Sequence, residues 1–294
     1  MRYRSLGGRG KVVSAVSLIL EPDASRRRPA DWVSLIYSAL ECGVSGFEIR
    51  AVDTAMGEGI GEALECVDRR MVFVALRLVM QPGRLASLEA VAGQIRSAVA
   101  ATGLHYLDAA LLDPAALGSP QGLKELGALK SAGLIHTLGV TGSTQAVDDL
   151  IGTGALDLLA TDYSLLSGWT ERRRVRMAVA TDMAVLGYGH FPREQLELLI
   201  KPRRRERANP LAGTGGYSFL NETKDWTCEE LCLAYVLTEP SLASVLVRAR
   251  SVEHLQQLAA VPDRELPSVA AAQIEMARFS SLAESEEQAR QANV

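Results

Sequence analysis

The sequence predicts an α/β fold, a single (β/α)8 TIM barrel preceded by an N-terminal β-hairpin. Eight short runs rich in Val, Ile and Leu alternate along the chain with segments of helical periodicity. Strands this apolar are expected where helices bury both faces of a parallel sheet. Eight such units within 294 residues fit a closed barrel better than an open doubly wound sheet. No linker rich in Pro, Gly or Ser divides the chain, so we predict one domain over residues 1–282.

The predicted elements begin with the hairpin. Residues 2–14 place Gly7, Gly8 and Gly10 between short apolar stretches, which is the pattern of a hairpin before the first barrel strand. The apolar runs predict strands at 13–20, 47–52, 72–78, 106–112, 135–140, 156–160, 184–188 and 244–247. The periodic segments predict helices at 31–42, 59–67, 85–100, 123–132, 145–151, 171–180, 194–199 and 228–237.

Two segments depart from this alternation. The connection 189–225 carries a basic run, 201–207, followed by three glycines. Long loops in compact domains are usually functional or mobile, so the basic run either clamps phosphates or is a solvated charged stretch. At the C-terminus, residues 283–294 are polar and short of apolar anchors, which predicts a disordered tail.

Gly57, Gly59 and Gly61 form a short glycine-rich motif. A dinucleotide-binding fingerprint requires such glycines within a βαβ unit of an open sheet. Here they follow the second predicted barrel strand, so we interpret them as glycines that open a helix.

The charge distribution argues against nucleic-acid and membrane partners. A formal net charge of -4 provides no global basic field, and the arginine clusters at 26–28 and 172–176 have no interleaved aromatic residues. The sequence contains no run of about twenty apolar residues without a charged residue, so it predicts no transmembrane helix. The N-terminal segment makes a poor signal peptide. Four scattered cysteines without neighbouring histidines predict reduced thiols and no metal site. We therefore expect a cytoplasmic protein.

Five segments, taken in order, resemble the aldo-keto reductase family: YRSLGGRGKVVSAVSL, ECGVSGFEIRA, GEGIGEAL, LKSAGLIHTLGVTGS and VRARSVEHLQQL. The resemblance extends from Met1 to about Ala260. It implies a barrel that binds a nicotinamide dinucleotide, NAD(H) or NADP(H), at the C-terminal ends of its strands.

Reductases of this family use an aspartate, a tyrosine, a lysine and a histidine for proton transfer. The resemblance places these four positions at Glu48, Asp53, Arg77 and Asp113, and none of them matches. An alignment error cannot supply the missing types, because no tyrosine occurs between positions 37 and 106 and no lysine between 11 and 124. We therefore assign no catalytic residue.

The replacements also fail on chemical grounds. An ionised Asp53 cannot donate a proton to a developing alkoxide, and its charge repels that alkoxide. Arg77 keeps a positive charge and is expected to pair with Glu48 or Asp113. The sequence thus predicts an ion-pair cluster in place of a proton-transfer site, and no carbonyl reduction.

The resemblance places cofactor contacts at Thr141, Gly142, Ala160, Tyr188, Arg248, Arg250 and Ser251. Tyr188 stands where the family stacks an aromatic ring on the nicotinamide, although a strand-end tyrosine is equally consistent with packing. The carboxamide positions keep one hydroxyl, that of Thr141. Arg250 and Ser251 match the family's basic and hydroxyl residues at the start of a helix, which is a natural anion site.

An inherited cofactor pocket without a proton donor suggests a regulator that binds a dinucleotide. The chain is similar to members of the family that regulate bacterial cell division, which implies the division protein FtsZ and a sensor histidine kinase as partners. One alternative is a working oxidoreductase that uses Tyr188 or a bound water as proton donor. Another is a scaffold that binds no cofactor.

Overall fold

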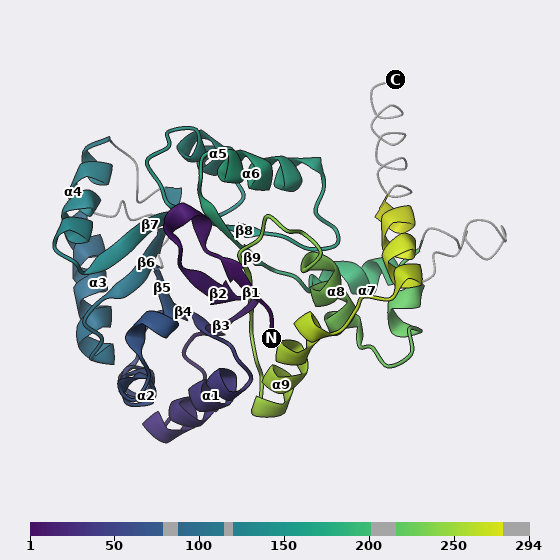
Figure 1. Cartoon of the computed structure of the whole chain (residues 1–294), viewed down its shortest axis with the longest axis horizontal. Helices are drawn as coiled ribbons and strands as arrows, with labels where there is room; N and C mark the ends of the chain where they lie inside the picture. The colour runs from purple at the N-terminus through teal and green to yellow at the C-terminus, as the bar shows by residue number, and fades with distance from the viewer. Residues whose placement is uncertain (79–87, 115–119, 201–215, 279–294) are drawn as a thin grey trace.

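The computed structural model describes residues 1–78, 88–114, 120–200 and 216–278 and shows the predicted barrel with its hairpin (Figure 1). Eight parallel strands close in the order β10-β3-β4-β5-β6-β7-β8-β9. They are β3 (Val16–Leu20), β4 (Gly46–Arg50), β5 (Phe73–Arg77), β6 (Leu107–Leu112), β7 (Ile135–Thr141), β8 (Leu158–Asp162), β9 (Ala184–Tyr188) and β10 (Ser244–Val247). The predicted fold class is confirmed.

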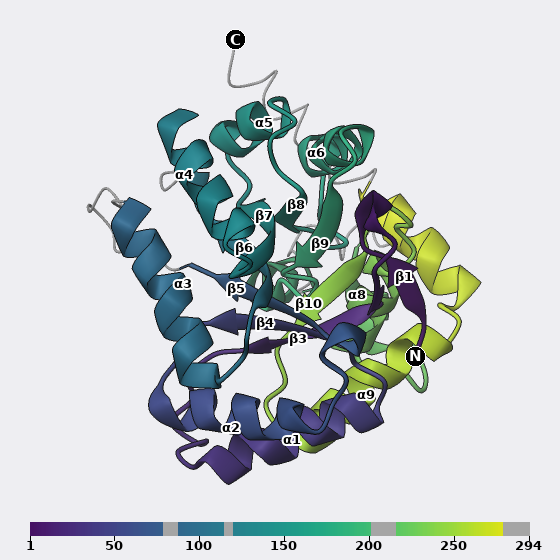
Figure 2. The same cartoon turned by 60° about the vertical axis from the view of Figure 1, so that its left-hand side comes forward.

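Helices connect successive strands and cover the outside of the barrel (Figure 2). They are α1 (Pro29–Glu41), α2 (Thr54–Glu65), α3 (Leu88–Thr102), α4 (Pro120–Ser131), α5 (Gln145–Ile151), α6 (Trp169–Ala180), α7 (Arg193–Ile200), α8 (Cys228–Val236), α9 (Val252–Ala260) and a last helix over 268–278. Short 3-10 turns add η1 (Gly7–Arg9), η2 (Arg69–Met71), η6 (Ser218–Asn221) and η7 (Val261–Asp263). No helix in the described part of the chain is both long and apolar enough to cross a membrane. The basic run at 201–207 and the predicted disordered tail lie outside the described residues.

The hairpin closes the N-terminal end of the barrel. Strand β1 (Tyr3–Ser5) pairs antiparallel with β2 (Val12–Ser14), as predicted, and the predicted first strand divides at Ala15 into the second arm of the hairpin and β3. Beside this hairpin, the Lys11 ammonium pairs with the buried carboxylate of Asp108, which also binds the Arg69 guanidinium at 2.7 Å. Closure of this end leaves the C-terminal ends of the strands open for a functional site.

The glycine motif has a packing role that the sequence interpretation missed. Helix α2 begins at Thr54, so the glycines lie inside the helix rather than at its start. A Cβ on Gly57 would lie 2.6 Å from the carbonyl oxygen of Ala101, and one on Gly59 would lie 2.6 Å from that of Pro29. The glycines therefore allow α1 and α3 to pack closely against α2.

Helix α6 is fastened to α5 by a buried ion pair. Arg174 Nε lies 2.5 Å from Asp148 Oδ1 and Nη2 lies 3.2 Å from Oδ2. The two side chains are 2% and 10% exposed. Removing one partner of such a pair leaves a buried charge without compensation.

We expect Arg174→Met to lower the free energy of unfolding by about 3–5 kcal/mol, because the Asp148 carboxylate would lose its counter-ion. The matched control is Arg193→Met, since Arg193 forms an exposed pair with Glu197 at 2.8 Å. That change should cost far less stability, because an exposed ion pair contributes little to folding. Denaturant unfolding of both variants measures the difference, and equal losses would contradict the assignment.

Candidate functional site

Charged side chains gather where the strands β4 and β5 end. Glu48 on β4 is wholly buried and accepts hydrogen bonds from Arg50 Nε at 2.5 Å and Arg77 Nη2 at 2.9 Å. The strand register sets Arg50 opposite Arg77, two residues beyond Glu48, so the three side chains share one face. The expected pair of Arg77 with Glu48 is confirmed. Two guanidinium groups on one carboxylate leave these three side chains with a net charge of +1.

Tyr188 ends β9 beside this cluster. The Arg77 guanidinium carbon lies 4.5 Å from the centroid of the Tyr188 ring, so Arg77 occupies one face of the ring that was expected to stack on a nicotinamide. Burial and the Asp162 carboxylate raise the pKa of the Tyr188 phenol, and Arg77 and Thr141 only partly oppose them. Tyr188 is therefore a weaker acid than an ordinary tyrosine.

The predicted carboxamide positions lie together at the ends of β7 and β8. The Gly142 N–H donates to the Ala160 carbonyl at 3.0 Å, and Ala160 itself is fully buried among the apolar residues inside the barrel. The buried Thr141 Oγ1 meets no partner at full hydrogen-bond geometry, although it lies close enough to the Tyr188 phenol to affect its pKa. Of Thr141, Gly142 and Ala160, Thr141 is thus the residue whose side chain has a polar group.

The remaining positions of the catalytic set provide carboxylates. Asp53 is exposed and caps α2, because its Oδ1 accepts the N–H of Met56 at 2.8 Å. Asp113 is exposed directly after β6. The four positions therefore carry Glu48, Asp53, Arg77 and Asp113, none of which is a tyrosine, a lysine or a histidine.

A second group of polar residues lies at the start of α9. Ser251 caps this helix, and its Oγ accepts the N–H of His254 at 3.2 Å. Arg250 Nη2 lies 3.3 Å from Glu229 Oε2, a carboxylate on α8. These four residues line one pocket of 530 Å³, which also contains Arg193. At the helix start where an anion was expected, the negative group next to Arg250 is the protein's own Glu229.

Glu229 was not found by the sequence analysis, and neither was His190. His254 Nε2 lies 3.3 Å from Glu229 Oε2, and His190 Nε2 lies 3.7 Å from Oε1. Burial alone would raise the pKa of Glu229, but the two histidines and Arg250 outweigh it and hold the pKa below its usual value. His190 follows Tyr188 by two positions at the end of β9. This proximity in sequence was the signal that could have identified His190 as a site residue.

Arg248 is held by a partner of its own. Its Nε lies 2.5 Å from Glu21 Oε1, so the pair joins the residues that follow β10 and β3. The neighbouring Arg26 donates from Nη2 to the carbonyls of Ala249 and Arg250 at 3.2 and 3.1 Å. These contacts fix the backbone that presents Arg250.

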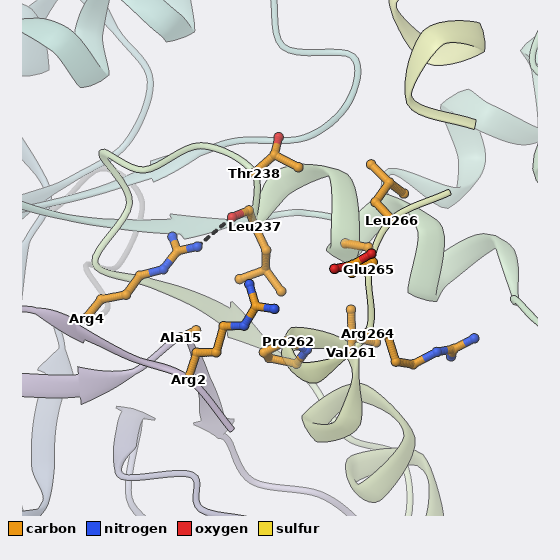
Figure 3. A pocket seen from close by; sticks show the side chains of 11 residues that line it. Arg2, Arg4, Ala15, Leu237, Thr238, Val261, Pro262, Arg264, Glu265 and Leu266 are labelled. Atoms are coloured by element: carbon orange, nitrogen blue, oxygen red, sulfur yellow. Dashed lines mark hydrogen bonds between the residues drawn. The ribbon is translucent and has the colours of Figure 1, made fainter. Parts of the chain in front are cut away.

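A pocket of 380 Å³ near the hairpin is a different feature (Figure 3). Arg4 reaches across its wall to the carbonyl oxygens of Leu237 at 2.5 Å and Leu242 at 2.8 Å, after the end of α8. Ala15, which precedes β3, also lines it. This pocket lies at the N-terminal end of the barrel, where side chains serve stability rather than chemistry.

Comparisons with known proteins agree with this architecture. The profile of the Aldo/keto reductase family matches residues 36–278. The solved structure of "aldo-keto reductase AKR11C1 from Bacillus halodurans (holo form)" superposes with a TM-score of 0.71 at 17% identity, over 94% of this chain and 95% of that one. A comparison with curated proteins finds no match. Among the described residues, no group of three or more His, Cys, Asp or Glu is arranged to hold a metal ion.

Proposed function

The chain belongs to the aldo/keto reductase family, and we propose that it binds a nicotinamide dinucleotide without reducing carbonyls and acts by contacting other proteins. The observation that carries this proposal is the cluster in the barrel mouth. There the Glu48 carboxylate holds Arg50 and Arg77, where a reductase needs groups that transfer a proton. The proposal has three parts, which concern catalysis, the dinucleotide and the partners.

Carbonyl reduction needs a proton donor next to the oxygen that gains negative charge. The Asp53 carboxylate accepts the Met56 N–H at the N-terminus of α2, so it serves as an acceptor there instead of a proton donor. Arg77 is bonded to Glu48 and stacked on Tyr188, and its lowering effect on the pKa of that phenol is smaller than the raising effect of burial. The geometry therefore supports binding without turnover.

The residues at the start of α9 fit the adenosine end of a dinucleotide. Arg250 and the Ser251 hydroxyl face one pocket, and the N-terminus of a helix attracts anions. At the other end, the buried Thr141 hydroxyl lies next to the Tyr188 ring and could bind a carboxamide. A bound dinucleotide supplies hydride-transfer chemistry in the family, whereas here these residues only bind and orient it.

Glu229 favours NAD(H) over NADP(H) at this pocket. Its carboxylate lies 3.3 Å from the Arg250 guanidinium, so it would stand next to a 2′-phosphate that Arg250 contacts. A phosphate and a carboxylate that contact the same guanidinium repel each other, whereas ribose hydroxyls can donate hydrogen bonds to a carboxylate.

Protein partners form the third part of the proposal. The resemblance to the cell-division regulator KidO supports FtsZ and a sensor histidine kinase as the partners. A family member that keeps a ligand pocket but lacks a proton donor can still report the ligand, provided that the ligand changes its affinity for a partner.

A second candidate is an oxidoreductase with an atypical site. Tyr188 is the phenol nearest to the cluster, and the Arg77 guanidinium over its ring acts to lower its pKa. Burial outweighs this effect, because the pKa of Tyr188 remains above its usual value. This candidate would require that reduction depend on Tyr188.

We expect the purified chain to bind NAD(H) and Arg250→Ala to weaken that binding by about 1.5–3 kcal/mol, the contribution of a charge-assisted hydrogen bond. Arg70→Ala is the control, since Arg70 lies on η2 in an exposed pair with Asp68. Isothermal titration calorimetry gives both affinities. No heat and no thermal shift with either dinucleotide at millimolar concentration would refute the binding.

Glu229→Gln should selectively strengthen NADP(H). Removing the carboxylate charge beside Arg250 should improve NADP(H) affinity by ~10-fold or more, since a repulsion of about 1.4 kcal/mol is lost. NAD(H) affinity should change little. The same titrations measure both, and an equal change for the two dinucleotides would show that Glu229 does not discriminate between them.

We expect no oxidation of NADH or NADPH above background with aldehydes, ketones or quinones. Asp53→Tyr alone should not create activity, because the chain would still lack the lysine and the histidine at the other positions, and such residues act as a unit. Absorbance at the reduced-nicotinamide band follows the reaction. Steady turnover by the wild type that is lost in Tyr188→Phe would instead establish the second candidate.

A further inference from the structure

The outward side of α6 carries an aromatic and basic surface that the functions described above do not use. Trp169, Arg173, Arg176 and Ala180 are spaced by three or four residues, so they fall on one side of the helix, and all are exposed. We name these four residues the α6 surface. We propose that it docks an acidic segment of a protein partner that also presents an apolar side chain.

Trp169 is exposed to an unusual degree for this chain. Its side chain is 66% exposed, whereas Trp32 is 1% exposed. Trp226 is half-buried beneath the Arg264 guanidinium, which lies 3.6 Å from its ring centroid. The Arg173 guanidinium lies 5.4 Å from the Trp169 ring, one turn along the helix. Tryptophan and arginine are both enriched among the residues that contribute most of the binding energy at protein interfaces.

The guanidinium groups of this surface are not neutralised by any carboxylate in the described part of the chain. Arg173 and Arg176 form no ion pair with the described residues. Two neighbouring arginines of the same helix behave differently, since Arg172 donates to the Tyr235 hydroxyl at 3.1 Å and Arg174 pairs with Asp148. Two uncompensated positive charges thus point outward from a chain whose net charge is -4.

The helix beneath this surface is held firmly in place. Arg174, Val175 and Ala178 are buried on its inner side, and Glu171 accepts the N–H of Gly168 at 2.8 Å to cap its N-terminus. A partner would therefore meet side chains on a fixed backbone. Such preorganisation reduces the entropy lost on binding.

The chemistry of the surface selects the class of partner. Two guanidinium groups neutralise too few phosphates for nucleic-acid binding, and the apolar side of α6 faces the barrel, so it cannot enter a bilayer. Carboxylates of an acidic segment can bind Arg173 and Arg176 in bidentate fashion, while an apolar side chain packs on the Trp169 indole.

This inference rests on the proposed function only for the existence of a protein partner. The α6 surface lies outside the barrel beside α5, whereas the dinucleotide pocket lies between α8 and α9 (Figure 2). A change at Arg173 or Arg176 should therefore leave dinucleotide affinity intact. Loss of docking and loss of dinucleotide binding can be told apart by titrating both ligands.

The test uses the full chain and a synthetic probe, acetyl-EEDLFEELDE-amide, with a second peptide in which Leu and Phe are replaced by Ser. Fluorescence anisotropy of the labelled peptides at physiological salt measures affinity. Trp169→Ala and the double variant R173E/R176E should each weaken the first peptide at least tenfold. The control R96E/K224E makes the same charge change at exposed positions outside α6 and should stay within twofold.

Other outcomes would overturn the proposal. One is that the first peptide shows no saturable binding, and another is that the serine peptide binds equally well. A loss of affinity in R96E/K224E as large as that in R173E/R176E would also contradict it. A DNA duplex, or vesicles of phosphatidylcholine and phosphatidylglycerol, could instead bind more tightly than the peptide. If that binding depends on Arg173 and Arg176, the partner is a nucleic acid or a membrane and the protein partner is refuted. NAD(H) titration of R173E/R176E should match the wild type, so a failure of docking leaves the proposed function standing.

Discussion

A fully buried carboxylate requires positive charge around it, and Glu48 imposes this requirement on the barrel mouth. Arg50 and Arg77 meet it, and each lies on a strand that the barrel already fixes. Once Arg77 is bound to Glu48, its flat guanidinium lies over Tyr188 and occupies one face of that ring. The position of Glu48 thus decides which side chains face the open mouth of the barrel.

The two ends of the proposed dinucleotide site share a physical feature, since each pairs its arginine with an internal carboxylate. Arg77 pairs with Glu48, and Arg250 pairs with Glu229. The pairs differ in exposure, because the Arg77 side chain is 14% exposed and that of Arg250 is 66% exposed. A ligand can compete for Arg250 at small cost in solvation, whereas breaking the buried pair would strand Glu48. Ligand recognition should therefore be concentrated at the adenosine end.

Sequence patterns predicted the barrel because its determinants are local. Buried strands read as apolar runs, and the pair of Glu48 and Arg77 follows from two adjacent strands. The true start of α2 escaped prediction, because Gly57 is explained by its close approach to α3 rather than by the helix itself. Glu229 and His190 are separated by 39 positions and meet only in the folded chain. The contact between Trp169 and Arg173 could be predicted from the sequence, because residues four apart on a helix are neighbours.

The ion-pair cluster in the mouth of this barrel restricts single substitutions. The apolar cluster between strands and helices supports the fold independently of the mouth, so the ion-pair cluster is compatible with a stable protein. Within the cluster, however, each member depends on the others. A lysine in place of Arg77 would keep the charge but lose the planar contact with Tyr188 and the fork geometry that suits Glu48. The Glu48 carboxylate would then be less well compensated, so stability favours an arginine at this position.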